Sequence, residues 1–278
     1  MHLSGVLTSE NFANNYFGYG NETVNNDDDL GLDYNRVKTS VYGASIGIVK
    51  KSGFGSDYGF KLAFEGIELQ DSPNRIITDL VPVGSDEAFY ERRYFSSVDA
   101  TYEYESFDNK INPSKGMAFM FNAGAKTELE KFKNIFAFVN SNLGFYNALG
   151  MRELVLKTDI RTQLRFGDDF LFYQGAIIGG HNGLRGFRTD RFTGKSSLVT
   201  SADLRYSFPS FKTKTLPFQI GVFGGFDVGR VWAKYEDSEK WHNDYGFGTW
   251  ITAAESLSGT FNFFNSVEGW RFSFGFGF

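Results

Sequence analysis

The sequence lacks several residue patterns that define common functional sites. It has no cysteine, which excludes a disulfide framework and a thiolate metal site. Its 3 histidines lie far apart and show no metal-ligand spacing. Proline occurs only 5 times, and no apolar run is long enough for a transmembrane helix. A membrane protein built from strands stays possible, because alternating strands give only a weak hydropathy signal.

Motifs for catalysis, cofactors and nucleic acids are also missing. The chain has no Gly-x-Ser-x-Gly turn and no His-Glu-x-x-His pattern. The acidic residues 25–33 lack the spacing of a calcium-binding loop, so a solvated loop is favoured. The net charge of -5 and the absence of a basic stripe argue against a nucleic-acid partner. We therefore expect no enzymatic activity and no cofactor.

Aromatic residues and glycine are abundant instead. Aromatic residues make up 18% of the chain, with 32 phenylalanines, and glycine also occurs 32 times. A soluble core would draw more on leucine, isoleucine and valine. The composition therefore favours many strands whose outer faces are aromatic, as in a transmembrane barrel.

Residues 152–166, RELVLKTDIRTQLRF, show the pattern that organises the chain. From Glu153 on, apolar and threonine side chains alternate with charged or amide side chains, and only Val155 is out of place. A helix cannot give this period of two. The same alternation recurs in residues 92–107 and 197–208. The polar face carries charges of both signs, which suits the wet lumen of a transmembrane barrel better than a soluble barrel.

We predict about twelve such strands, and residues 3–20 could add one or two. They average close to a dozen residues, longer than ordinary strands and long enough to cross a bilayer with a tilt. With no linker, residues 1–278 are predicted to form one domain, with partial strands and a loop in 1–35. The fold class is an all-β transmembrane antiparallel β-barrel of about 12–16 strands. The predicted strands are 36–50, 56–70, 92–107, 116–129, 133–147, 152–166, 169–179, 197–208, 216–232, 245–255, 258–265 and 268–278.

The stretch GGHNGLRGFRTDRFTG, residues 179–194, concentrates glycine and arginine between two predicted strands. A phosphate-binding P-loop is the first alternative, since Gly194-Lys195-Ser196 matches the end of that motif. Its required first glycine is Thr189, however, and the residues after Ser196 alternate as a strand where a helix is needed. The loop must have another role.

Three motifs carry a family resemblance. They are FDNKINPSKG at residues 107–116, Leu-Arg-Gly-Phe at 184–187, and VFGGFDVGRVW at 222–232. In this order they resemble the C-terminal barrel of the BamA/TamA-type superfamily of outer-membrane assembly and translocation proteins, also called bacterial surface antigens. Aromatic residues at alternate positions near the end of the chain resemble the C-terminal signal by which assembly machinery recognises a barrel. Ser273 stands where the family usually has a glycine. The aromatic residues of this signal are Trp270, Phe272, Phe274, Phe276 and Phe278.

The resemblance implies that the glycine-rich loop is extracellular and folds back into the barrel, where its arginine pairs with acids on the inner wall. Strand parity is an independent check, because the apolar alternation of 218–228 places Asp227 on the luminal face. The same count places Asp203 there. We predict that Arg185 docks against Asp227 and Asp203, that Gly186 permits the tight loop tip, and that Phe187 packs beside it. The alternative is a solvated arginine in a flexible loop.

The resemblance also implies a function in inserting or translocating proteins at the outer membrane of a Gram-negative bacterium. The expected partners are outer-membrane lipid, client outer-membrane or secreted proteins, and possible assembly-machinery subunits. The alternative is a passive anchor or pore for another domain, because NYFGYGNET at residues 15–23 resembles barrels that follow a metallophosphoesterase domain in some Bacteroidota proteins. We expect the chain to be the C-terminal portion of a longer protein or a member of the family with a smaller barrel.

Overall fold

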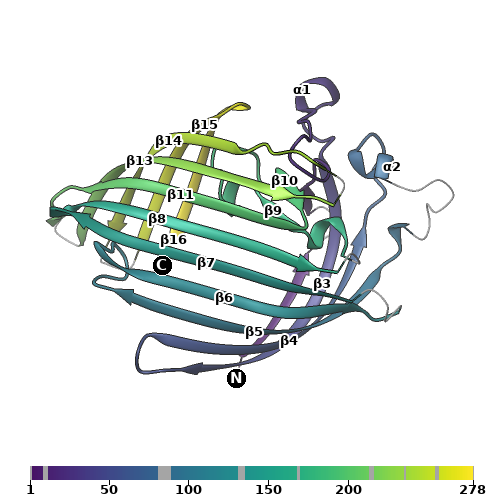
Figure 1. Cartoon of the computed structure of the whole chain (residues 1–278), viewed down its shortest axis with the longest axis horizontal. Coiled ribbons are helices and arrows are strands. Elements are labelled where there is room, and N and C mark those ends of the chain that lie inside the picture. Colours follow the sequence, from purple (N-terminus) through teal and green to yellow (C-terminus); the bar gives the residue numbers. More distant parts are fainter. Residues whose placement is uncertain are drawn as a thin grey trace.

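The structure is a computed structural model that describes residues 2–8, 12–80, 89–130, 135–167, 170–212, 216–234, 236–253 and 257–277. Most of them lie in one antiparallel sheet of 14 strands, which curves round on itself in Figure 1. The prediction of an all-β antiparallel barrel is confirmed. The strands of this sheet are β1 (His2–Thr8), β2 (Ala13–Asn15), β3 (Arg36–Lys51), β4 (Ser56–Leu69), β5 (Arg93–Phe107), β6 (Lys115–Glu128), β7 (Ile135–Leu149), β8 (Met151–Phe166), β11 (Ser196–Ser207), β12 (Phe211–Lys212), β13 (Pro217–Trp232), β14 (His242–Ala253), β15 (Leu257–Ser266) and β16 (Gly269–Gly277).

The predicted strand at 169–179 is wrong. This segment contains a 3₁₀ turn, η1 (Phe172–Gln174), and the short strand β9 (Ala176–Ile178). β9 pairs with β10 (Phe192–Gly194) in a separate two-stranded sheet. The segment's apolar side chains pack against other elements, because Phe172 and Tyr173 contact a cluster that includes Tyr16, Val37 and Leu69, and Ile178 packs with Val199 and Val231. This burial explains their strand-like sequence. The main sheet gains β1 and β2 instead, in the region where one or two extra strands were expected, and also the two-residue strand β12, which was not predicted.

The strands alternate between a buried face and an exposed aromatic face. On β13, Val222 and Phe226 are exposed, whereas Phe223 and Asp227 are buried. Because successive side chains point to opposite faces, the first pair lies on the outer surface and the second faces the barrel interior. Among the residues that the structure describes, no helix is both long and apolar enough to cross a membrane.

The connections at the two ends of the barrel differ in length. At one end, which we call the turn end, β3 and β4 are joined by residues 52–55, and β7 and β8 by Gly150 alone. The opposite loop end carries the longer connections: residues 9–35 with the helix α1 (Asp27–Leu30), residues 70–92 with the helix α2 (Ile76–Leu80), and residues 167–195. The glycine-rich loop therefore starts from the loop end.

The order of the strands leaves two edges in the sheet. Within the described ranges, β1 pairs only with β3, and β16 pairs only with β15. Each of these edge strands presents backbone N–H and C=O groups on one side that no ladder of the sheet uses. The two edges come from the beginning and the end of the chain, so they are the sides between which the barrel would close.

Candidate functional site

The loop between β8 and β11 turns back over the interior of the barrel through a series of unusual backbone conformations. Gly179, Gly180 and Gly183 have φ values of 119°, 57° and 87°. Leu184 has a φ of 52° without being a glycine, a conformation that costs free energy in most residues. Its side chain is completely buried, so packing offsets this strain. The turn places the next residue, Arg185, inside the barrel.

Arg185 is held by Asp227 of β13 through three hydrogen bonds. Its Nε and Nη2 atoms donate to the two carboxylate oxygens of Asp227 over 2.8 and 2.6 Å, and its backbone N–H donates over 3.0 Å. Asp227 has no exposed surface. This bidentate geometry is the strongest that a guanidinium and a carboxylate form. The loop is therefore fixed to the inner wall through both its backbone and its side chain.

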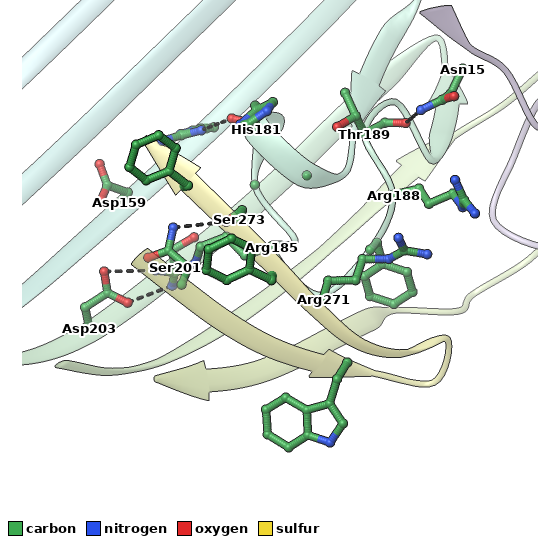
Figure 2. Close-up of a pocket in the computed structure, with 18 of the residues that line it drawn as sticks. Asn15, Asp159, His181, Arg185, Arg188, Thr189, Ser201, Asp203, Arg271 and Ser273 are labelled. Carbon is green, nitrogen blue, oxygen red and sulfur yellow. Dashed lines mark hydrogen bonds and ion pairs between the residues drawn. The ribbon is translucent and has the colours of Figure 1, made fainter. Parts of the chain in front are cut away.

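Asp203 of β11 engages the other edge of the same guanidinium. Nη2 and Nη1 of Arg185 donate to its oxygens over 2.7 and 3.2 Å, as the dashed lines in Figure 2 mark. The ring of Phe264 lies 4.0 Å from the guanidinium carbon, at cation–π distance. Burial alone would lower the pKa of Arg185, but the hydrogen bonds and charges of Asp227 and Asp203 raise it above its ordinary value. Arg185 therefore stays charged.

Two features of this site were not predicted from the sequence. Asp244 of β14 is completely buried and lies directly opposite Asp227 in the β13–β14 pairing. Gly225 of β13 faces Asp203, and a Cβ atom there would lie 2.3 Å from a carboxylate oxygen of Asp203 and 2.9 Å from Nη2 of Arg185. The pairing partner of each acid depends on strand register, which the sequence alone does not fix.

Gly186 lies against the inner wall of β14 and β15. A Cβ atom on it would lie 2.7 Å from the Cβ of Asp244 and 3.1 Å from the backbone carbon of Asn265. Its backbone is not in the left-handed region, unlike that of Leu184. The sharp turn is therefore made by the residues before it, and Gly186 is required for space. The next residue, Phe187, is buried against the rings of Phe192 and His242.

Replacing Gly186 with alanine is expected to destabilise the folded barrel by about 1–3 kcal/mol, because the methyl group overpacks the docked loop. The measurement is urea unfolding in detergent micelles, followed by the different gel mobilities of folded and unfolded barrel. Gly224→Ala is the matched control, since a Cβ atom there would meet only a carbonyl oxygen at 3.9 Å. Equal stability of the two variants would contradict the close packing of Gly186.

Residues 15–23, which we call the N-terminal arm, form a second set of contacts at the loop end. The side chain of Asn21 pairs with the backbone of Val231, donating over 2.8 Å and accepting over 3.0 Å. The backbone N–H groups of Asn21 and Glu22 both donate to the carboxylate of Glu236, over 2.7 to 2.9 Å. The arm is therefore fixed to the end of β13 and to the connection that follows it.

The N-terminal arm also contacts the docked loop. The amide of Asn15 donates to the carbonyl of Thr189 over 3.0 Å. The backbone N–H of Gly20 donates to the carbonyl of Thr193 over 2.8 Å, next to a parallel bridge between Tyr19 and Thr193. The arm thus ties the start of the chain to a loop in its second half.

Arg191 connects the N-terminal arm to the last hairpin of the sheet. Its Nη1 and Nη2 atoms donate to the hydroxyl and the carbonyl of Thr23, each over 2.7 Å. Its Nε donates to Glu268, in the turn between β15 and β16, over 2.5 Å. The rings of Phe17 and Phe192 lie 4.7 and 4.6 Å from the guanidinium carbon. One buried arginine therefore joins the beginning of the chain to the edge hairpin at its end.

The motif FDNKINPSKG forms the connection between β5 and β6 at the turn end. The carboxylate of Asp108 accepts hydrogen bonds from the backbone N–H groups of Asn109, Ser114 and Lys115 over 2.9 to 3.0 Å. Burial alone would raise the pKa of Asp108, but the hydrogen bonds of Ser114, Lys115 and Arg152 lower it below its ordinary range. The role of the aspartate here is to close a turn on the far side of the barrel from Arg185.

The aromatic residues of the predicted C-terminal signal lie on β16. Trp270, Phe272, Phe274 and Phe276 alternate along the strand and are exposed on one face. Phe272 packs against Phe261 and Phe263 of β15, and Phe274 packs against Phe261. Phe278 lies outside the described residues. Recognition of this strand by assembly machinery stays a prediction.

The geometry of the site holds the loop in place through Arg185. Its arginine is neutralised by two carboxylates, Asp203 and Asp227. Across the described part of the chain, no three histidine, cysteine, aspartate or glutamate side chains gather as a metal site would require. The contacts instead hold a loop in the lumen of a barrel.

A family profile described as the Omp85 superfamily domain matches residues 6–278. The chain belongs to the Omp85 superfamily. The resemblance to BamA/TamA-type barrels is thereby confirmed. No curated protein sequence is similar enough to match the chain.

A solved structure has a similar fold, the crystal structure of BamA from Haemophilus ducreyi lacking POTRA domains 1-3. The two superpose with a TM-score of 0.66 at 16% sequence identity, over 99% of this chain and 58% of the other. At this identity the likeness concerns the fold. The chain spans 58% of the length of the solved protein that it matches.

Proposed function

We propose that this Omp85 chain acts in the insertion or translocation of proteins at the outer membrane of a Gram-negative bacterium. In this proposal residues 1–278 form one integral barrel domain, the C-terminal portion of a longer protein. Its partners are outer-membrane lipid, client outer-membrane or secreted proteins, and assembly-machinery subunits. The proposal assigns the chain no catalytic reaction.

The observation that carries the proposal is the pair of edge strands. β1 and β16 each pair on one side only within the described residues, so each offers backbone donors and acceptors to an additional strand. An incoming strand gains main-chain hydrogen bonds there before it has a partner of its own. The docked loop supports the same function, because it keeps the β11–β14 wall in one arrangement while the edges change partners.

The alternative is a passive anchor or pore for a fused or associated domain. The interior of the barrel beside Arg185 is polar, and this observation favours a pore. The two functions differ in what the edge strands do. An insertase requires them to accept a client strand, whereas an anchor or pore requires only that the barrel stay folded.

To test this, the chain is reconstituted in liposomes. Another outer-membrane barrel, unfolded in urea, is then added as the client. We expect the client to fold several-fold faster than in liposomes that carry an unrelated barrel of similar size. The gel mobility of the folded client gives the rate. An equal rate in both preparations would reject the insertase and favour the passive anchor. Single-channel conductance of the same liposomes would then separate an anchor from a pore.

A further inference from the structure

The line along which the edge strands β1 and β16 would meet, which we call the seam, runs from one end of the barrel to the other. β1 leads from the turn end to the loop end, and β16 leads back from the loop end to the turn end. Within the described ranges, no ladder of backbone hydrogen bonds joins the two strands. Contacts between other parts of the two sides therefore decide where the seam is held and where it can open.

The N-terminal arm is fixed to the β1 side of the seam. It starts at the end of β2, which pairs with residues 36–38 of β3, the neighbour of β1. The side chain of Tyr16 is buried in a cluster that includes Val37 of β3 and Ile77 of α2. A displacement of β1 and β3 at the loop end would therefore carry the arm with it.

The same arm is bonded to strands on the β16 side. The side chain of Asn21 donates to the carbonyl of Val231, at the end of β13, over 2.8 Å. The carboxylate of Glu236, in the connection from β13 to β14, accepts hydrogen bonds from the backbone N–H groups of Asn21 and Glu22 over 2.7 to 2.9 Å. In the order of the strands, β13 and β14 lie near the β16 edge, whereas β3 lies next to β1. The arm therefore joins the two sides of the seam at the loop end.

Arg191 of the docked loop connects the arm to the last hairpin. Its guanidinium donates to the hydroxyl of Thr23 over 2.7 Å and to Glu268, in the β15–β16 turn, over 2.5 Å. The hydroxyl of Ser266, at the end of β15, donates to the backbone carbonyl of Gly186 over 2.8 Å. Both sides of the seam are therefore bonded to the docked loop, which the acids of β11 and β13 fix to the inner wall.

The contacts that cross the barrel at the turn end lie away from the edge strands. The side chain of Asn112, in the connection from β5 to β6, donates to Ser207 of β11 over 3.1 Å and to Gln219 of β13 over 3.2 Å. β1 and β16 take no part in these contacts. Near its turn end β16 contains Gly275, where a Cβ atom would meet nothing within 4 Å, and a glycine without a side chain to pack weakens a strand. The seam is therefore held more firmly at the loop end than at the turn end.

We propose that the seam opens from the turn end while the loop end stays closed, so that a client strand enters between β1 and β16 from the turn end. The backbone groups of the edge strands would bind it by strand addition. The identity of the entering strand rests on the proposed insertion function, whereas the direction of opening rests on the loop-end contacts alone. Each added strand separates the two edges at the turn end and leaves Arg191 and the arm in place.

The experiment measures distances across the seam by pulsed electron paramagnetic resonance on the chain in liposomes. The chain has no cysteine, so two introduced cysteines carry the only nitroxide labels. Leu3→Cys/Phe276→Cys labels the turn end and Leu7→Cys/Trp270→Cys labels the loop end, at four exposed positions. We expect a broad distance distribution at the turn end and a narrow one at the loop end. When a urea-unfolded client barrel is added, the turn-end distance should increase by about 5 Å for each added strand, and the loop-end distance should not change.

Arg191→Ala should broaden the loop-end distribution, because the last hairpin loses its bond to the arm. Arg152→Ala is the matched control, since its side chain is exposed and takes no part in the loop-end contacts. Gel mobility verifies that each variant is folded. The two label pairs in the otherwise unchanged chain test the proposal even if Arg191→Ala does not fold.

The proposal is overturned if the two ends give equally broad distributions, if the loop end separates when the client is added, or if Arg191→Ala and Arg152→Ala give the same loop-end distribution. The folding rate of the client is measured on the same labelled chains. Faster client folding with a separating loop end would reject this direction of opening and retain the insertase. Unequal distributions without faster client folding would support the direction of opening and reject the insertase.

Discussion

Arg185→Ala is expected to lower the free energy of unfolding by on the order of 3–5 kcal/mol. The substitution leaves Asp227, which has no exposed surface, and the largely buried Asp203 without their cation. Uncompensated buried carboxylates cost far more than the pairing itself contributes. The loop should leave the inner wall, and single-channel conductance should rise because the loop no longer fills the lumen. Urea unfolding in micelles and bilayer conductance measure the two effects.

A double-mutant cycle separates docking from a general loss of stability. Asp227→Ala alone should destabilise the barrel similarly, and Arg185→Ala/Asp227→Ala should be no worse than either single variant, because the partners act as one unit. Arg152→Ala is the control, since its side chain is 81% exposed and surface changes of this kind usually stay within about 0.5 kcal/mol. A stability of Arg185→Ala equal to that of this control would mean that the loop does not depend on its arginine.

Arg191→Ala is expected to have an effect of similar size, about 3–5 kcal/mol. Its side chain is 5% exposed, and its removal leaves Glu268 without its closest cation and Thr23 without two hydrogen bonds. Because these contacts join the N-terminal arm to the β15–β16 turn, we expect hydrogen exchange to increase in both regions at once. Mass spectrometry of peptides after exchange measures this, together with urea unfolding.

The matched control for Arg191 is the exposed pair Arg36–Asp33. Its atoms lie 2.9 Å apart, but the two side chains are 48% and 64% exposed. Arg36→Ala should therefore cost less than about 1 kcal/mol, as exposed ion pairs do. If Arg191→Ala changes stability as little as Arg36→Ala, or if exchange in the arm stays at the wild-type level, Arg191 does not connect the two regions.

The strands and their faces were predictable because period-two alternation is a local property of the sequence. It placed Asp203 and Asp227 on the luminal face, which is where the structure has them. The prediction for segment 169–179 was wrong for the same reason, since its apolar residues are buried against other parts of the barrel without forming a strand of the main sheet. A short apolar run looks alike whether it lies in a barrel wall or in a hairpin inside it.

The rest of the site depends on register and on contacts between distant parts of the chain. Asp244 lies opposite Asp227 only because β13 and β14 pair in one particular register. Arg191 and Glu268 are 77 residues apart, and no periodicity marks the arm residues that contact Arg191. The resemblance to a family identified the arginine loop. It gave no indication of the N-terminal arm's contacts, which follow from three-dimensional proximity alone.

The N-terminal arm has a consequence for the order in which the molecule can assemble. Glu22 lies 3.1 Å from Lys240, a partner 218 residues later in the chain, and Arg191 ties the same region to Glu268. Closing so long a loop carries an entropic cost that only already folded partners can offset. The arm is synthesised before these partners but therefore reaches its final position only after they have folded. Completion of the barrel is thereby coupled to the arrival of its C-terminal hairpin, so a partly made chain cannot take on the finished arrangement at the loop end.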